Sequence, residues 1–267
     1  MYAKTVFRSL IVFFILIDGY NSFAQKDYWK ILFPGFDYNL YKASIDKEDN
    51  LHLALKSTIP GQPNKFVSID KNGFVIYQSN TNELPLLHFH DSTGNKYLVS
   101  WLPSTLILKK YSSQQTLLWS TNYIITNAVT IQTSGAVSEF EFIRSANYLL
   151  NTSGHLLISG IFKTDTVPPT NFSTLCVFIF NSGNGQYVST YYNNHTQDPI
   201  TETRFQEDLN GNINVIYYNS VTDVYLRKFN LSGTEILQQK YGDYFAGNKK
   251  ITSVKVTDNF IYLGYEI

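Results

Sequence analysis

The fold of this chain is decided by the stretch Arg204–Ile216, which reads RFQEDLNGNINVI. Asp208 opens a turn in this stretch, Gly211 closes the turn three positions later, and apolar residues alternate with polar ones on both sides. An aspartate side chain can accept a hydrogen bond from the backbone two residues ahead, and glycine adopts the positive φ that closes such a turn. The stretch therefore predicts a β-hairpin.

The same pattern returns at residues 70–73, 91–95, 151–154 and 230–233, and the hairpins come in pairs. The first turns align at Asp49, Gly94, Gly154, Gly211 and Asp258, at intervals of 45, 60, 57 and 47 residues, and the second turns at Gly73, Ser113, Gly183 and Gly233. Each unit then holds four short strands, which is the blade of a β-propeller. We predict an all-β fold, a β-propeller of four-stranded antiparallel blades, with about five blades visible and the last one incomplete.

A resemblance to a known class supports this architecture. Phe89–Val99 (FHDSTGNKYLV) and Arg204–Ile216 resemble the repeats of secreted bacterial β-propellers, and Ser22–Gln25 resembles the signal-peptide junctions of Bacteroidetes-type bacteria. The resemblance covers residues 28–267. The chain lacks the Ser-x-Asp-x-Gly-x-Thr-Trp box of sialidase-type propellers and the Gly-His…Trp-Asp signature of the WD type. The resemblance therefore implies an architecture and no particular activity.

The beginning of the chain predicts export. Lys4 and Arg8 precede the apolar run Leu10–Ile17, and the small residues Ser22 and Ala24 form a signal-peptidase site. The alternative is a membrane anchor, but the run is far shorter than the roughly 20 residues that span a bilayer. We expect a signal peptide over residues 1–24, one β-propeller domain over 25–267, no transmembrane anchor, and a location outside the cell, in the periplasm or at the cell surface.

The single cysteine agrees with a bacterial envelope, because it excludes an internal disulfide. Cys176 lies in an apolar strand pattern, so we expect a buried thiol that packs as a small hydrophobe rather than a nucleophile.

The end of the chain supplies only Thr252–Val256 and Phe260–Tyr265 to the fifth unit. Tyr28–Phe33 can donate one more strand but not two. Either the fifth blade has three strands or the sequence is a fragment of a longer propeller, truncated at the C-terminus. We favour the fragment, because propellers leave only short, protected edges.

A metal site is one candidate for chemistry. His88 and His90 point to the same side of a predicted strand and Asp91 follows at the turn, so the three residues form a candidate site for Zn²⁺ or Cu²⁺. A third imidazole has to come from His52, His155 or His195. The alternative is that His88 and His90 are ordinary strand residues.

Acidic residues offer two further candidates. The turns Asp46–Asn50 and Asp208–Asn212 place oxygens at alternate positions, as the first half of a calcium loop does, but they lack its downstream glutamate, so turn formation accounts for them equally. Glu139 and Glu141 share one strand face about 7 Å apart, a spacing compatible with inverting glycoside hydrolysis or with two solvated side chains.

Exposed tyrosines are candidates for ligand binding, since Tyr191, Tyr192, Tyr217 and Tyr218 could stack on sugars or peptides.

Without residues 1–24 the chain has one more acidic than basic residue, which argues against nucleic acid as a partner. The sequence holds no Gly-rich phosphate loop, serine nucleophile elbow or paired CxxC. We expect an exported, non-catalytic binding or interaction module for a protein or carbohydrate ligand. The alternatives are a carbohydrate-active enzyme on a propeller scaffold and a structural part of a larger surface protein.

The export hypothesis predicts the N-terminus of the mature protein. Expressed in a bacterium with a signal peptidase, the protein should be recovered outside the cytoplasm with Gln25 as its first residue, because Ala24 is the small residue before the cleaved bond. Intact-mass and N-terminal sequence analysis of the envelope fraction measure this. Recovery of the uncut chain in the cytoplasm would exclude the signal peptide.

Overall fold

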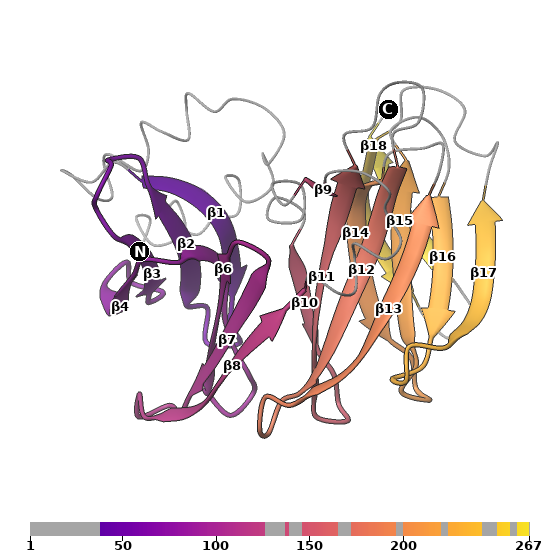
Figure 1. Ribbon diagram of the computed structural model, residues 1–267. Coiled ribbons are helices and arrows are strands. Elements are labelled where there is room, and N and C mark those ends of the chain that lie inside the picture. The colour runs from indigo at the N-terminus through magenta and orange to yellow at the C-terminus, as the bar shows by residue number, and fades with distance from the viewer. Residues whose placement is uncertain are drawn as a thin grey trace. The chain divides into compact units, whose positions relative to one another are not determined.

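The computed structural model describes residues 38–125, 137–138, 146–164, 172–195, 200–219, 224–241, 250–256 and 261–266. The chain divides into two compact units, Met1–Leu102 with Leu108–Leu117, and Pro103–Ile107 with Leu118–Ile267. All regular elements in the described ranges are β-strands (Figure 1). Within these ranges no helix is long and apolar enough to cross a membrane.

Four antiparallel sheets of consecutive strands make up most of the structure, and we call them blades 1 to 4. Blade 1 is β1 (Tyr38–Ile45), β2 (Leu51–Ser57), β3 (Asn64–Ile69) and β4 (Val75–Thr81); blade 2 is β5 (Leu84–His90), β6 (Lys96–Leu102), β7 (Thr105–Tyr111) and β8 (Leu117–Ile124). Blade 3 is β10 (Asn147–Leu150), β11 (His155–Thr164), β12 (Phe172–Asn181) and β13 (Tyr187–His195), with the short β9 (Val137–Ser138) paired to β11. Blade 4 is β14 (Ile200–Glu207), β15 (Ile213–Asn219), β16 (Val224–Phe229) and β17 (Glu235–Tyr241). The predicted all-β fold of four-stranded antiparallel blades is confirmed.

A fifth sheet pairs β18 (Lys250–Val256) with β19 (Ile261–Glu266). Its register shifts between Ile251 and Ser253, and the first strand pairs of blades 1, 2 and 4 shift in the same way near the start of their first strand. The shared irregularity marks β18 and β19 as the first two strands of a fifth blade, as the hairpin alignment predicted. The segment Tyr28–Phe33, expected as a partner strand, lies outside the described residues.

The predicted turns close the hairpins through side-chain hydrogen bonds. In the turn 208–212, Asp208 Oδ1 accepts from the backbone N–H groups of Asn210 and Asn212, both at 2.9 Å. The turns that Asp46, Asp70, Asp91 and Asn230 open repeat these two bonds. The residue before the last turn position has positive φ, and it is glycine in most turns but Asp49 in 46–50 and Gln115 in 112–116.

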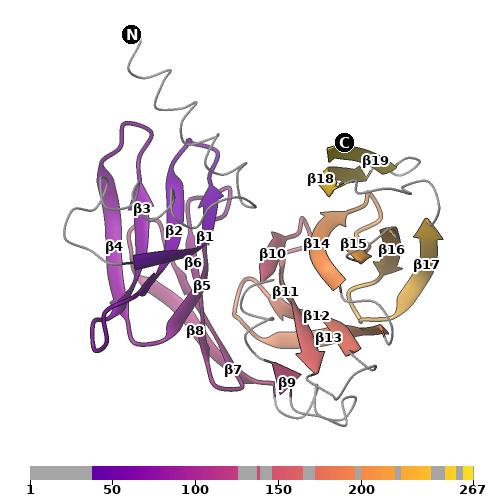
Figure 2. The same ribbon diagram turned by 90° about the horizontal axis from the view of Figure 1, so that it is seen from above.

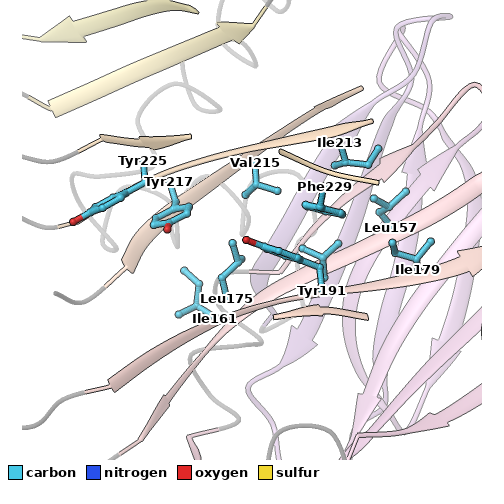
Figure 3. Packing of buried hydrophobic residues seen from close by; sticks show 11 residues of the cluster. Leu157, Ile161, Leu175, Ile179, Tyr191, Ile213, Val215, Tyr217, Tyr225 and Phe229 are labelled. Atoms are coloured by element: carbon cyan, nitrogen blue, oxygen red, sulfur yellow. The ribbon is translucent and has the colours of Figure 1, made fainter. Parts of the chain in front are cut away.

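Within each unit, buried apolar side chains of the middle strands form the core. Within the second unit, β11 to β13 and β15 to β16 contribute to one cluster between blades 3 and 4, centred on Val177, Ile179, Val215 and Phe229 (Figures 2 and 3). In blade 1, Leu53 and Val67 belong to a cluster on one face of the sheet, while Ala54 and Phe66 pack on the other face. A blade built this way needs a neighbour on each side.

Two glycines with almost the same backbone conformation allow the close packing of turns to be tested. Gly233 has φ of +81°, and a Cβ atom there would lie 2.8 Å from the backbone oxygen of Thr190. Gly154 has φ of +77°, and the nearest atom to a Cβ there would be Ser182 Oγ at 3.8 Å. Both glycines lie in the second unit.

Substitution of Gly154 by alanine should therefore cost only the left-handed backbone strain, about 1–2 kcal/mol. Substitution of Gly233 should cost at least about 1 kcal/mol more, because the new methyl group presses on backbone that cannot swing away. Urea unfolding of both variants beside the wild type measures the difference. Equal losses would show that the turn of blade 4 can move away from β13.

Candidate metal centre

Three histidines from two blades meet in the first unit. His52 comes from β2, and His88 and His90 come from one side of β5; one ring nitrogen from each lies within 4.8 Å of the others. The side chains of His52 and His88 are buried and that of His90 is 15% exposed. Sequence analysis predicted the His88–His90 pair and named His52 among three possible partners. The structure brings His52 to the pair, whereas His155 and His195 lie in blade 3.

The carboxylate at this cluster belongs to Asp46. Its Oδ2 lies 3.0 Å from His52 Nε2 and 3.7 Å from His90 Nδ1. The first turn of blade 1 fixes the carboxylate, because Asn50 donates to Oδ2 through its side chain and to Oδ1 through its backbone. The sequence offered Asp46 only as part of a candidate calcium turn, although its position six residues before His52 follows from the hairpin that Asp46 opens.

Asp91, which the sequence suggested as the carboxylate, serves its own turn instead. It accepts hydrogen bonds from Thr93 Oγ1 at 2.7 Å and Asn95 Nδ2 at 2.9 Å, and Lys110 Nζ lies 3.8 Å from its Oδ2. The carboxylate within ion-pairing distance of the histidines is thus that of Asp46, while metal binding by Asp91 stays a prediction. The reason is that β5 ends at His90, so the next residue begins a turn whose backbone donors bind the Asp91 side chain.

A hydroxyl and two unpaired ring nitrogens complete the cluster. Ser68 Oγ lies 2.9 Å from His52 Nδ1 and 3.4 Å from His88 Nε2. In the part of the chain that the structure describes, His88 Nδ1 and His90 Nε2 are buried and make no hydrogen bond. Buried polar atoms normally have a partner. Two ring nitrogens without one point to a group that the protein atoms do not supply.

The electrostatics keep the three imidazoles neutral near pH 7. Burial lowers the pKa of His88 well below its ordinary range and that of His90 to about 4, and neighbouring His52 adds to both shifts. Burial also lowers the pKa of His52, although Asp46 opposes the shift. Burial acts to raise the pKa of Asp46, but hydrogen bonds from Asn50 and His52 outweigh it and the pKa is lowered. Neutral imidazoles and an ionised carboxylate are the forms that bind metal ions.

A buried lysine lies beside the cluster. Lys96 pairs with His90 across β5 and β6, its ammonium lies over the ring of Tyr77, and burial lowers its pKa to about 8. Its Nζ makes no hydrogen bond to the described residues. The positive charge of Lys96 therefore acts on all three histidines.

The candidate calcium turns divide between two roles. Asp46 belongs to the histidine cluster, while Asp208 Oδ2 lies 2.9 Å from Lys228 Nζ and its Oδ1 accepts from the turn backbone. The groups around Asp208 are thus hydrogen-bond donors and an ammonium rather than further oxygens, so turn formation accounts for Asp208. Glu139 and Glu141 lie outside the described residues.

The tyrosines suggested for ligand binding are mostly structural. Tyr191 and Tyr217 are 3% and 1% exposed and belong to the core between blades 3 and 4 (Figure 3). Tyr191 donates to Glu235 at 2.7 Å, and Tyr217 accepts from Arg227 Nε at 3.2 Å. Strands β13 and β15 thus turn these two rings into the core, and ligand binding by the tyrosines stays a prediction. Tyr192 is half-buried, and the Tyr218 side chain is outside the described part.

Cys176 is buried as expected, and burial raises the pKa of its thiol well above the ordinary value.

Comparison with known proteins identifies the architecture. No protein-family model and no curated protein sequence matches this chain. Among solved structures, a PL25 polysaccharide lyase, an ulvan lyase, aligns with a TM-score of 0.51 at 10% identity, over 84% of this chain and 65% of that one. The Nup133 β-propeller domain of Vanderwaltozyma polyspora aligns at 0.47 and 10% identity, over 85% and 68%. A protein of unknown function from Bacteroides caccae aligns at 0.39 and 11% identity, over 67% and 56%.

This chain has a β-propeller fold. The chain spans less than two thirds of the length of the ulvan lyase and of the Bacteroides caccae protein. At these identities the likeness to solved structures concerns the fold alone. The chemistry of this propeller has to be argued from its own residues.

Acid should weaken the folded protein through the histidine cluster. His90 has a pKa of about 4 when folded against an ordinary value of 6.5, so between these values the unfolded state binds more protons. The free energy of unfolding should be highest above the unfolded pKa of 6.5 and should fall as the pH drops toward 4. Urea unfolding across this range, with a chelator present, measures the slope.

His90→Gln should reduce that slope by about one proton, because the substituted side chain does not titrate. His155→Gln, the same substitution at a histidine of blade 3, is the control for the effect of the substitution itself. If the free energy of unfolding of His90→Gln changes with pH as steeply as that of the wild type, the acid sensitivity comes from groups other than His90.

Proposed function

We propose that this chain is an exported, non-catalytic β-propeller that acts as a binding module for another protein at the cell envelope or outside the cell. Export rests on the signal-peptide pattern of residues 1–24. The binding role rests on one repeated feature of the blades, the exposed apolar residues with which their outermost strands begin.

The last strand of each blade, β4, β8, β13 or β17, lies at a sheet edge and starts beside the blade's second turn. Large apolar side chains are exposed at this point in every blade: Phe74, Val75 and Ile76 in blade 1, Leu117 and Leu118 in blade 2, Tyr187 and Val188 in blade 3, and Ile236 and Leu237 in blade 4. Phe74 is 70% exposed and Ile236 is 54% exposed. Single exposed apolar residues are ordinary, but their return at one position of four blades indicates a use.

The chemistry of these positions favours a protein partner. Most of the exposed side chains are aliphatic, and aliphatic groups gain by burial against another apolar surface, whereas sugars are bound chiefly by aromatic rings and polar groups. The adjoining strand edge offers backbone N–H and C=O groups that an extended peptide can pair with. A partner segment that pairs with an outermost strand would bury the exposed apolar side chains and the backbone groups of that strand edge.

Two glutamates of the described residues, Glu83 and Glu235, have structural partners, which supports a non-catalytic role. Glu83 accepts from Ser100 and lies 3.2 Å from Lys109, and Glu235 accepts from Tyr191 and Arg227. Burial acts to raise the pKa of Glu83, yet Ser100 and Lys109 hold the pKa below its ordinary value. A glycoside hydrolase instead needs one carboxyl group that stays protonated near neutral pH. The carbohydrate-active enzyme and the structural part of a larger surface protein are the alternatives.

Site-specific photo-crosslinking in the producing bacterium tests the binding role. A photo-reactive phenylalanine derivative replaces Ile76 in one variant and Ile236 in another, with Lys71, an exposed turn residue of blade 1, as the control position. We expect one and the same protein to be captured from Ile76 and Ile236 and not from Lys71. Mass spectrometry of the adducts identifies it.

Two results would contradict this function. Equal capture from all three positions would show that the apolar residues are merely accessible. Depolymerisation of an acidic or neutral polysaccharide by the purified protein, seen as new reducing or unsaturated ends, would establish the enzyme instead. Capture of a protein encoded beside this chain, in fixed stoichiometry and only as part of a larger assembly, would favour the structural role.

A further inference from the structure

The repeated blades allow one position to be compared within the same chain. In blade 2, the aspartate of the first turn lies near a lysine of the third strand: Lys110 Nζ is 3.8 Å from Asp91 Oδ2. In blade 4 the same pair is Lys228 and Asp208, 2.9 Å apart. Each lysine stands two residues before the residue that opens the second turn of its blade. The pairing gives the carboxylate of each first turn a positive partner.

Blade 3 follows the same logic with neutral residues. Its first turn is opened by Asn151 instead of an aspartate, and the position of the lysine holds the buried Ile179. Where the carboxylate is absent, the cation is absent as well.

Blade 1 breaks the rule. Its first turn keeps the carboxylate of Asp46, but the position of the lysine holds Ser68, two residues before Asp70. Among the described residues, the ion-pairing partners of Asp46 are His52 and His90, and neither is a lysine or an arginine. His52 itself stands where blades 2, 3 and 4 have Tyr97, Leu157 and Asn214. The carboxylate that the other charged turns neutralise with lysine thus faces three imidazoles.

We propose that a divalent transition-metal ion of the Zn²⁺ class takes the place of the missing lysine and is bound by His52, His88, His90 and Asp46. The proposal is independent of the binding role of the outermost strands. It differs from the site expected from sequence in two ligands, since His52 is added and Asp46 replaces Asp91.

Such an ion requires the three imidazoles, which already face one another, to draw closer together. Ligand atoms about 2.0–2.1 Å from a tetrahedral Zn²⁺ lie about 3.3 Å from each other. Asp46 Oδ2 already lies 3.0 Å from His52 Nε2, and one ring nitrogen of each of the three histidines lies within 4.8 Å of the other two. Imidazole nitrogens select Zn²⁺, Cu²⁺ or Ni²⁺ over Ca²⁺ and Mg²⁺.

The surroundings indicate a structural rather than a catalytic ion. Four protein ligands would fill a tetrahedral shell and leave no open position for a substrate. Ser68 Oγ, 2.9 Å from His52 Nδ1, is placed to hold the ring as outer partners of metal-bound histidines do. His52 and Asp46 come from blade 1 and His88 and His90 from β5 of blade 2, so the ion would join the two sheets within the first unit.

Lys96 is the competing source of positive charge. Its ammonium lies next to the cluster and over Tyr77, so it could serve as a permanent internal cation and repel a metal ion. Replacement of Lys96 by methionine separates the two ideas, because the neutral side chain keeps the apolar stem and removes the charge.

Calorimetric titration of the chelator-treated protein with Zn²⁺ tests the proposal, with Co²⁺ as the spectroscopic probe. We expect one ion per chain and the intense visible bands of four-coordinate Co²⁺. Asp46→Asn and His90→Gln should weaken binding at least about tenfold. Asp91→Asn, the same change in the equivalent turn of blade 2, and His155→Gln should leave it unchanged, and Lys96→Met should leave it unchanged or tighten it.

Asp46→Asn and His90→Gln are chosen because asparagine can still close the turn and His90 lies at the edge of the cluster, so both should fold, which thermal unfolding verifies. Failure of the wild type to bind Zn²⁺ would overturn the proposal, as would equal losses in Asp46→Asn and Asp91→Asn. Loss of Zn²⁺ binding in a folded Lys96→Met variant would also overturn it, because removal of a repelling charge cannot weaken a real site.

Discussion

The hydrogen bonds from one carboxylate or amide oxygen to two backbone N–H groups of its own turn are the interaction on which the rest of this structure depends. Asp46, Asp70, Asp91, Asp208 and Asn230 all make this pair of bonds. A hairpin closed in this way has a fixed register, and a slip of one residue would exchange the buried and exposed faces of both strands. The register in turn decides which side chains meet between blades.

The fold could be predicted because its signals are local. The two turns of each blade, the four strands between them and the incomplete fifth unit follow from spacing and alternation in the sequence. The candidate site could be predicted only in part. His88 and His90 are neighbours on one strand, so the sequence displays them, whereas Asp46 and His52 reach them through the packing of one blade on another. That packing has no period in the sequence, and the alternation that exposes a surface tyrosine also turns Tyr191 and Tyr217 into the core.

Blades 2 and 4 neutralise the carboxylate of their first turn in the same way. A buried or half-buried carboxylate is paired with a cation from the third strand, as Asp91 is with Lys110 and Asp208 with Lys228. An ionised group held away from water is costly unless such a partner is present. The histidine cluster of blade 1 is best understood as a departure from this shared arrangement. Comparison among the repeats of one chain therefore carries information that comparison with distant propellers does not.

The left-handed turn residues Asp49 and Gln115 bear on how the chain folds. Both adopt a φ of 66° in turns where most blades use glycine. This conformation costs an L-residue roughly 1–2 kcal/mol, so the hairpins around residues 46–50 and 112–116 are less favoured in isolation than those closed by Gly94 or Gly211. Their conformation therefore depends more on contacts with the rest of the chain. For the hairpin that presents Asp46, those contacts include the histidines of β5, so the cluster and the turn hold each other in place.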